Sequence, residues 1–99
     1  MIARIWHGRV PLGKATDYER YISATGMADY RATGNRGAWL LRRDEGDTAH
    51  LTTMTFWDTR SSIEAFAGRD IAVARNYPED DQYLVEHEPR VLHFIVVTS

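Results

Sequence analysis

The first ten residues, MIARIWHGRV, alternate their side chains in the way typical of a β-strand. Pro11 and Gly13 interrupt this alternation, because proline lacks the N–H that a sheet needs and glycine weakens a strand. We therefore predict a strand over residues 2–10. One side of it carries Ile2, Arg4, Trp6 and Gly8, and the other side carries Ala3, Ile5, His7 and Arg9.

A first amphipathic helix is predicted after this strand. Thr16 and Glu19 have the spacing of a capping box, which favours the start of a helix at this point. Gly26 interrupts the helical pattern, so we expect a cap or kink there, followed by a short turn through Tyr30. The apolar stripe of this helix is Tyr18, Tyr21, Ile22 and Thr25.

A second helix is expected to begin at Thr59 or Arg60 and to stop at Gly68. Threonine and serine hydroxyls at its start can accept hydrogen bonds from the free N–H groups of the first turn. A further helical turn is expected over residues 70–75, and one short turn from the acidic loop at 76–81. The inward-facing residues of the second helix are Ile63, Phe66 and Ala67.

The remaining segments predict the rest of a sheet. Residues 38–43 and 49–57 read as two strands, and the polar turn at 44–47 joins them into a hairpin. A cluster of turn residues at 34–37 precedes the hairpin. Residues 91–97 form the most apolar run of the chain and are expected to be the last strand.

The element order is strand, helix, strand, strand, helix, strand, which predicts an α+β, ferredoxin-like βαββαβ fold with a four-stranded antiparallel sheet. A chain of 99 residues has room for one core, so we expect a single domain over residues 1–99. Two helices cover only one face of such a sheet. A second copy of the same sheet is the economical cover for the other face, which predicts a homodimer.

Composition narrows the class of protein. A net charge of −2 without a basic run gives no reason to expect nucleic acid as a partner. The absence of cysteine excludes disulfides and favours a reducing, cytoplasmic location. The first apolar run is too short and too interrupted for a signal peptide, and no stretch has the length of a membrane span. We therefore expect a cytoplasmic protein with no membrane partner.

Four segments carry a resemblance to a known family: MIARIWHGRV, TFWDTRSSIEAFAG, NYPEDDQYL and RVLHFIVV. Together they make the chain similar to the antibiotic biosynthesis monooxygenase-like members of the dimeric α/β-barrel superfamily. The resemblance spans essentially the whole chain. It implies either a cofactor-free oxygenase acting on aromatic polyketides or quinols, a heme-degrading enzyme, or a member without established activity, because fold alone does not set function.

The heme-degrading branch can be compared residue by residue. That branch uses an asparagine on the first strand and a tryptophan and a histidine on the second helix. Matching the pattern to this chain places His7 at the asparagine, Phe66 at the tryptophan and Asn76 near the histidine. All three residues differ, and the usual axial ligand of the heme iron is missing at position 76. The resemblance therefore argues against heme degradation.

The cofactor-free oxygenases deprotonate an electron-rich phenol and let the resulting carbanion react with oxygen. Such chemistry needs a base and an apolar cavity. His7 is suited to the role of base, because an imidazole titrates near neutral pH. Arg75 or Arg69 could stabilise a developing oxyanion, and Phe66 completes the expected pocket. The residues expected to stack on an aromatic substrate are Trp39, Trp57, Tyr77 and Phe94.

Simpler interpretations stand beside these roles. We expect His7 to lie on the helix-covered face, as a pocket base or as a core histidine with satisfied hydrogen bonds. Trp57 can be a packing residue, and His93 can belong to the core or to a dimer interface, where it could face His7. No carboxylate has ligand spacing with these histidines, so no metal site is predicted. The alternative function is a non-catalytic small-ligand-binding or stress-response dimer.

Overall fold

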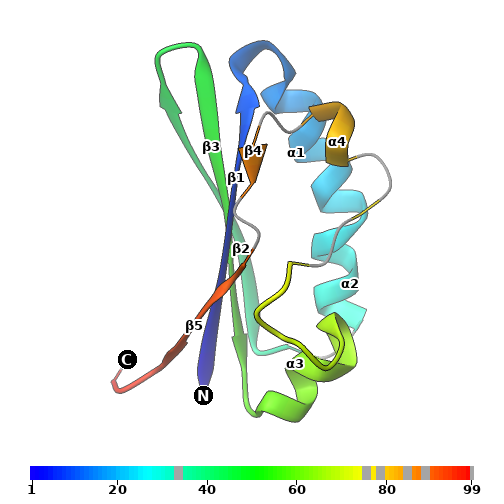
Figure 1. Cartoon of the computed structure of the whole chain (residues 1–99), viewed down its shortest axis with the longest axis vertical. Coiled ribbons are helices and arrows are strands. Elements are labelled where there is room, and N and C mark those ends of the chain that lie inside the picture. Colours follow the sequence, from blue (N-terminus) through cyan, green and yellow to red (C-terminus); the bar gives the residue numbers. More distant parts are fainter. Residues whose placement is uncertain (33–34, 75–76, 78–79, 84–85, 88–89, 99) are drawn as a thin grey trace.

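The computed structural model describes residues 1–32, 35–74, 77, 80–83, 86–87 and 90–98. An antiparallel sheet forms one layer, and the helices form a second layer on one face of it (Figure 1). The strands are β1 (Ile2–Pro11), β2 (Gly37–Glu45), β3 (Thr48–Trp57), β4 (Glu86–His87) and β5 (Leu92–Ile95). The helices are the 3₁₀ turn η1 (Leu12–Lys14), α1 (Ala15–Ala24), α2 (Gly26–Ala32), α3 (Arg60–Ala67) and α4 (Asp80–Tyr83).

The order of the strands is that of the predicted fold. The sheet runs β2-β3-β1, and both β4 and β5 pair antiparallel with the free edge of β1. Because β4 lies beside Gly8 and Arg9 while β5 lies beside Ile2 to Ile5, the two short strands share the fourth position of the sheet. This is the order of a ferredoxin-like α+β fold, so the predicted fold class is confirmed.

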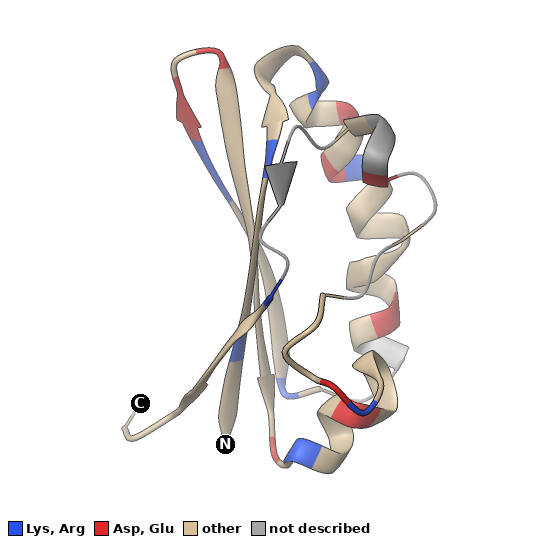
Figure 2. Ribbon diagram, in the orientation of Figure 1, with Lys and Arg blue, Asp and Glu red and all other residues tan. Residues whose placement is uncertain are grey.

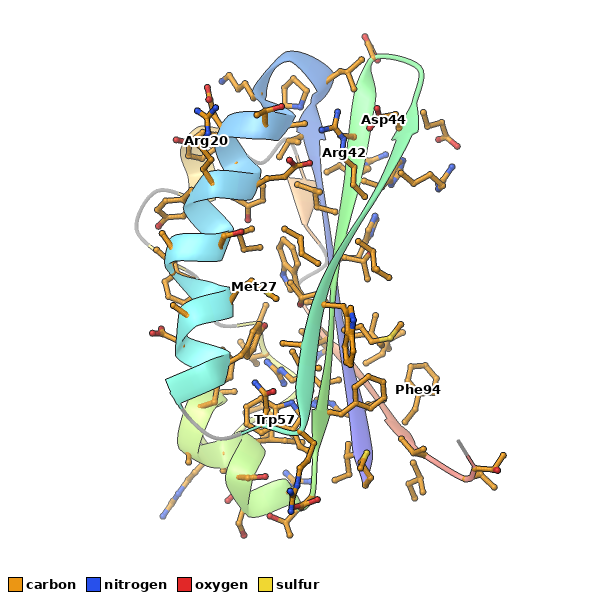
Figure 3. All side chains as sticks on the ribbon, turned by 180° about the vertical axis from the view of Figure 1, so that it is seen from behind. Arg20, Met27, Arg42, Asp44, Trp57 and Phe94 are labelled. Atoms are coloured by element: carbon orange, nitrogen blue, oxygen red, sulfur yellow. The ribbon has the colours of Figure 1, made fainter. Side chains whose placement is uncertain are left out.

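The burial pattern of strand β3 distinguishes the two faces of the sheet. Its alternate residues from Leu51 to Trp57 are buried beneath the helices. Figure 3 shows Trp57 between the sheet and the helices, whereas Phe94 of β5 lies on the other side of the sheet. We call this other side the open face. The register assigns to it Ala3, Ile5, His7 and Arg9 of β1, Trp39, Leu41 and Arg43 of β2, His50, Thr52, Met54 and Phe56 of β3, and Leu92 and Phe94 of β5.

The core beneath the helices has two parts. One part lies under α1 and is built on Val10, Ala15, Tyr18, Ile22, Ala49 and Leu51. The other part lies under α2 and α3 and is built on Met27, Tyr30, Trp57, Ile63, Phe66 and Ile71. Most of the acidic residues lie outside these parts, on the helices and at the turn that joins β2 to β3 (Figure 2). Among the described residues, no helix is long and apolar enough to cross a membrane.

The start of α3 follows the sequence prediction. Thr59 is its N-cap, and the hydroxyl oxygen of Thr59 accepts a hydrogen bond from the backbone N–H of Ser62 at 3.2 Å. The helix ends at Gly68, whose φ of 91° favours glycine because a side chain would be strained there. The predicted helix, its cap and its end are therefore confirmed.

The start of α1 differs from the prediction. The helix begins at Ala15 and its N-cap is Lys14, which makes no side-chain capping bond, so the capping box expected at Thr16 is wrong. A 3₁₀ turn leads directly into the helix and replaces the cap. The interruption at Gly26 is confirmed, but the segment beyond it is the helix α2 and not a short turn.

Two expectations near the C-terminus also need correction. The described part of residues 70–75 is a turn that ends in a bridge between Val73 and Arg90, not a turn of helix. The last strand is shorter than predicted and covers Leu92–Ile95. The short helical turn expected near the acidic loop is confirmed as α4.

Candidate functional site

A small cavity lies between the sheet and the helices, and we call it the central cavity. Its volume is about 30 Å³, which is room for a single water molecule. Strand β1 supplies Arg4 and Trp6, and β3 supplies Thr53. The other lining residues are Tyr18, Ile22, Gly26, Tyr30, Phe66, Tyr77, Asp80 and Val91. Aromatic rings with a few convergent polar groups are the usual lining of a small-molecule site.

The guanidinium of Arg4 is buried in this lining, with 2% of the residue exposed. Its Nη1 donates a hydrogen bond to the carbonyl oxygen of Ile71 and contacts Nε2 of His93 at 3.0 Å. Because a guanidinium carries donors only, Nε2 of His93 must be the acceptor. His93 is therefore neutral here, with its proton on Nδ1. Burial, then the charges of Arg4 and Arg60, lower the pKa of His93, which agrees with the neutral form.

No carboxylate of the described residues pairs with the charge of Arg4. None of the ion pairs between described residues includes Arg4, and its Nε is buried without a hydrogen-bond acceptor. The centre of the guanidinium lies 6.0 Å from the centre of the Phe66 ring, a weak cation–π contact. Burial lowers the pKa of Arg4, but an arginine keeps its proton inside a protein. The central cavity therefore has a positively charged wall.

An acidic group lies elsewhere in the lining. Asp80, the first residue of α4, is 7% exposed. Its Oδ1 accepts a hydrogen bond from the Tyr18 hydroxyl at 3.1 Å, and its Oδ2 accepts one from the backbone N–H of Tyr77 at 2.7 Å. Burial, then the charge and hydrogen bond of Asp80, raise the pKa of Tyr18, so Tyr18 stays protonated. Asp80 thus connects α1 to the chain around Tyr77 and α4 at the cavity.

Tyrosine rings complete the wall of the cavity. The hydroxyl of Tyr77 donates a hydrogen bond of 2.8 Å to Oδ2 of Asp29 on α2. The hydroxyls of Tyr30 and Thr53 lie 3.4 Å apart, and the Tyr30 ring packs against Phe66 with 4.6 Å between the ring centres. These contacts hold the rings in place around the space that Arg4 and Asp80 line.

Trp57 lies behind this wall. It is fully buried, and its indole N–H donates a hydrogen bond of 2.9 Å to the hydroxyl of Thr55. Its ring contacts the rings of Tyr30 and Phe66, with 6.2 and 5.8 Å between the respective centres. It is not among the described residues that line the cavity. Its position fits the packing interpretation, in which Trp57 supports the two rings that do line the cavity.

The expected position of His7 is wrong. The register pairs His7 with Thr52, which places it on the open face and not on the helix-covered face. There it stacks on His50 with an angle of 8° between the rings, and its Nε2 lies 2.9 Å from Nδ1 of His50. His93 is paired with Arg4 on the opposite face, so the two histidines do not face each other. His7 is not among the described residues that line the central cavity.

The other predicted site residues fall into two groups. Phe66 and Tyr77 line the central cavity. Trp39 and Phe94 lie on the open face, and each is 53% exposed. Arg69 is exposed. The predictions for Arg75 and Asn76 fall outside the described residues.

Sequence reasoning missed Arg4 and Asp80 as functional candidates. Arg4 shares one side of the first strand with Ile2 and Trp6. A charged residue between two large apolar ones on a strand indicates a buried charge, and a buried charge is a candidate for a functional role. Asp80 lies in an acidic run that favours a solvated loop, and only the fold brings it to Tyr18. The first signal could have been found in the sequence; the second could not.

Comparisons with known proteins agree with this fold. The sequence matches no model of a protein family, and a comparison with curated proteins gives no match either. Solved structures do match over the full length of the chain. The structure is similar to MhuD of Mycobacterium tuberculosis, a heme degrader with two hemes bound in its active site, at 22% identity and a TM-score of 0.65, over 100% of this chain and 98% of that chain.

A second similar structure is a candidate antibiotic biosynthesis monooxygenase from Bacillus cereus, at 10% identity and a TM-score of 0.67, over 99% of this chain and 92% of that chain. A third is an uncharacterised NIPSNAP domain protein from Burkholderia xenovorans, at 17% identity and a TM-score of 0.65, over 98% and 95% of the two chains. The chain therefore has the fold of the antibiotic biosynthesis monooxygenase-like proteins. Identities this low define the fold and leave the activity to the site.

Proposed function

We propose that this protein is a cofactor-independent, monooxygenase-like enzyme that acts on a small aromatic or quinone-type compound in the central cavity. The observation that carries the proposal is the lining of that cavity. Several aromatic side chains, among them Trp6, Tyr30, Phe66 and Tyr77, surround a buried guanidinium and a buried carboxylate. Rings bind a planar substrate, and fixed charges act strongly where water is excluded.

The two charged groups suit the first step of such a reaction. Asp80 uses one lone pair of each oxygen for Tyr18 and Tyr77, and a carboxylate can accept further hydrogen bonds. It would accept the hydroxyl proton of an electron-rich phenol, and Arg4 would stabilise the negative charge that develops on the ring. The carbanion then reacts with O₂. The ring carbon bonds to O₂, and the resulting peroxide takes up the proton held by Asp80 to give a hydroperoxide. Loss of the hydrogen of that carbon together with the outer oxygen, as water, then leaves a carbonyl, so a phenol and O₂ give a quinone and water and no external reductant is needed.

In this proposal Asp80 takes the role of base that the sequence suggested for His7. His7 lies across the sheet, stacked on His50, whereas Asp80 lies in the wall of the central cavity. A base must reach the proton that it removes. His7→Ala therefore serves as the matched control for changes at Asp80.

The proposed enzyme is a homodimer that forms through the open face. This face exposes large apolar side chains, namely Trp39, Leu41, Leu92 and Phe94. A monomeric soluble protein rarely leaves such a set of neighbouring apolar residues in water. A second copy of the same sheet would cover them, with the same patch used by both subunits.

Oxygen uptake with a panel of phenols and hydroquinones tests the proposal. We expect the wild-type protein to consume oxygen without added metal or flavin, Asp80→Asn to lose at least about 100-fold in rate, and His7→Ala to keep its rate. Asparagine keeps the shape of Asp80 and can still accept from Tyr18. Equal rates for the wild type and Asp80→Asn would contradict the role of Asp80.

Two further outcomes separate the competing functions. Binding of the phenols without oxygen uptake by the wild type would favour the non-catalytic ligand-binding dimer. Titration with hemin, followed by its absorption spectrum, examines the activity named for the similar M. tuberculosis protein. We expect no degradation of hemin, because the described lining of the cavity contains no histidine and His93 is held by Arg4.

A further inference from the structure

Arg4 differs from the surface arginines in how its charge is balanced. Arg36, Arg42 and Arg60 lie on the surface, and each pairs with a carboxylate: Asp58, Asp44 and Glu19, and Glu64, respectively. Arg4 is the buried one, at 2% exposed, and its described partners are a carbonyl oxygen and a neutral imidazole. Within the part of the chain that the structure describes, this buried arginine has no carboxylate partner, whereas these three exposed arginines do.

Such an arrangement is costly unless an anion completes it. A buried charge needs a partner of opposite sign as well as hydrogen bonds, and an arginine cannot escape the cost by losing its proton. The hydrogen bonds from Arg4 all start from Nη1, and its Nε has no acceptor. Asp80, the buried carboxylate in the described lining of the cavity, accepts hydrogen bonds from Tyr18 and Tyr77 and forms no ion pair with Arg4. No described residue supplies the negative partner, so the buried guanidinium offers a place for the anionic group of a ligand.

We propose that the ligand of the central cavity is a small aromatic acid, with its carboxylate on Arg4 and a ring hydroxyl directed to Asp80. This inference rests on the proposed aromatic site and adds the charge of its ligand. The Phe66 ring beside the guanidinium favours an acid attached to a flat ring over a free inorganic ion. Asp80 disfavours a second negative charge, so the ligand carries one acid group and donates a hydrogen bond at the other end.

The site as it stands is smaller than this ligand. A cavity of about 30 Å³ has no room for a benzene ring, so binding must move part of the lining. We expect Tyr77 to be the side chain that moves, because it lines the cavity and its ring meets α2 through a hydroxyl bond to Asp29. That hydrogen bond joins partly buried groups, which water can replace.

A pair of probes of nearly equal shape tests the inference. 4-Hydroxybenzoate and 4-hydroxybenzamide differ in charge, and calorimetry at constant ionic strength gives the affinity of the full-length protein for each. We expect the acid to bind at least about tenfold more tightly, the amount that one charge-assisted hydrogen bond supplies. Arg4→Met should remove this preference, and Arg4→Lys should keep part of it. Arg60→Gln, a surface control, should leave it unchanged.

The outcomes are distinct from those of the oxygenase proposal. Equal binding of both probes by the wild-type protein would overturn the inference, and this result does not depend on whether the Arg4 variants fold. A preference for the acid that survives in folded Arg4→Met would also overturn it. Selective binding of the acid without oxygen uptake would support the inference and contradict the oxygenase. Oxygen uptake on neutral phenols with no preference for the acid would support the oxygenase and contradict the inference.

Discussion

Proteins usually bury apolar side chains and expose charged ones, and the two faces of this sheet depart from that pattern in opposite ways. The face beneath the helices is buried, yet two charged side chains that do not pair with each other, Arg4 of β1 and Asp80 of α4, line the cavity there. The open face is accessible, yet it presents the apolar side chains of Trp39 and Phe94. A buried charge and an exposed aromatic cluster are both unfavourable in an isolated subunit. Under the two proposals, a ligand covers the one and a second subunit covers the other.

The largest expected effect comes from truncating a tryptophan on each face. Trp57→Ala should lower the free energy of unfolding by about 3–5 kcal/mol, because it leaves a cavity beneath Tyr30 and Phe66. Trp39→Ala should instead weaken the dimer by about 2 kcal/mol, roughly 30-fold in dissociation constant. Urea unfolding at two protein concentrations separates these effects, because only the dimer term depends on concentration.

Sedimentation or light scattering supplies the control for this comparison. Trp57→Ala should stay a dimer wherever it is folded, and Trp39→Ala should dissociate on dilution. A wild-type protein that is monomeric at all concentrations would contradict the role of the open face. A loss of stability in Trp39→Ala as large as in Trp57→Ala, and independent of concentration, would show that the two faces do not differ as described.

A smaller effect is expected at the cap of α3. Thr59→Ala removes the side-chain acceptor of the Ser62 N–H and should lower the free energy of unfolding by about 1 kcal/mol. Ser61→Ala, in the exposed first turn of the same helix, is the matched control and should change stability little. Phe66, which lines the cavity, lies on α3. The melting temperatures of the two variants therefore also report how much the cap contributes to the stability of the helix-covered face. Equal melting temperatures would contradict the cap.

The smallest effect concerns the pH dependence of stability. Burial, then the charges of Arg4 and Arg60, lower the pKa of folded His93 below its ordinary value. As the pH falls below about 6.5, His93 of the unfolded chain binds a proton, whereas His93 of the folded protein stays neutral. The free energy of unfolding should therefore decrease. His93→Gln can still accept from Arg4 but does not titrate, so its stability should depend less on pH. Unfolding at pH 7.5 and 5.5 measures the difference; equal slopes would contradict the neutral His93.

The sequence predicted the architecture because periodicity reports local structure well. The hairpin of β2 and β3, the cap at Thr59 and the end of α3 at Gly68 all depend on residues close together in the chain. The start of α1 was predicted wrongly, because the sequence offered a capping box at Thr16. A 3₁₀ turn, which has no comparable sequence signal, leads into the helix instead.

The faces of β1 could not be assigned in the same way. Alternation divides a strand into two sets of side chains but does not say which set is buried. His7 lies on the same side of the strand as Ala3 and Ile5, and this apolar company suggested the helix-covered face. The fold decides otherwise, because Trp6 and Arg4 share their side with the helices. His7 was therefore assigned to the helix-covered face, which β1 instead gives to Arg4 and Trp6.

Strand β5 carries consecutive residues to the two faces. His93 contacts Arg4 on the cavity side, and Phe94 is exposed on the open face. A shift of this strand would therefore displace residues on both faces. By thermodynamic reciprocity, whatever factor dimerisation applies to the affinity for the acid, the acid applies to the affinity between subunits. Binding of the acid in the cavity and association of the subunits would then be thermodynamically coupled.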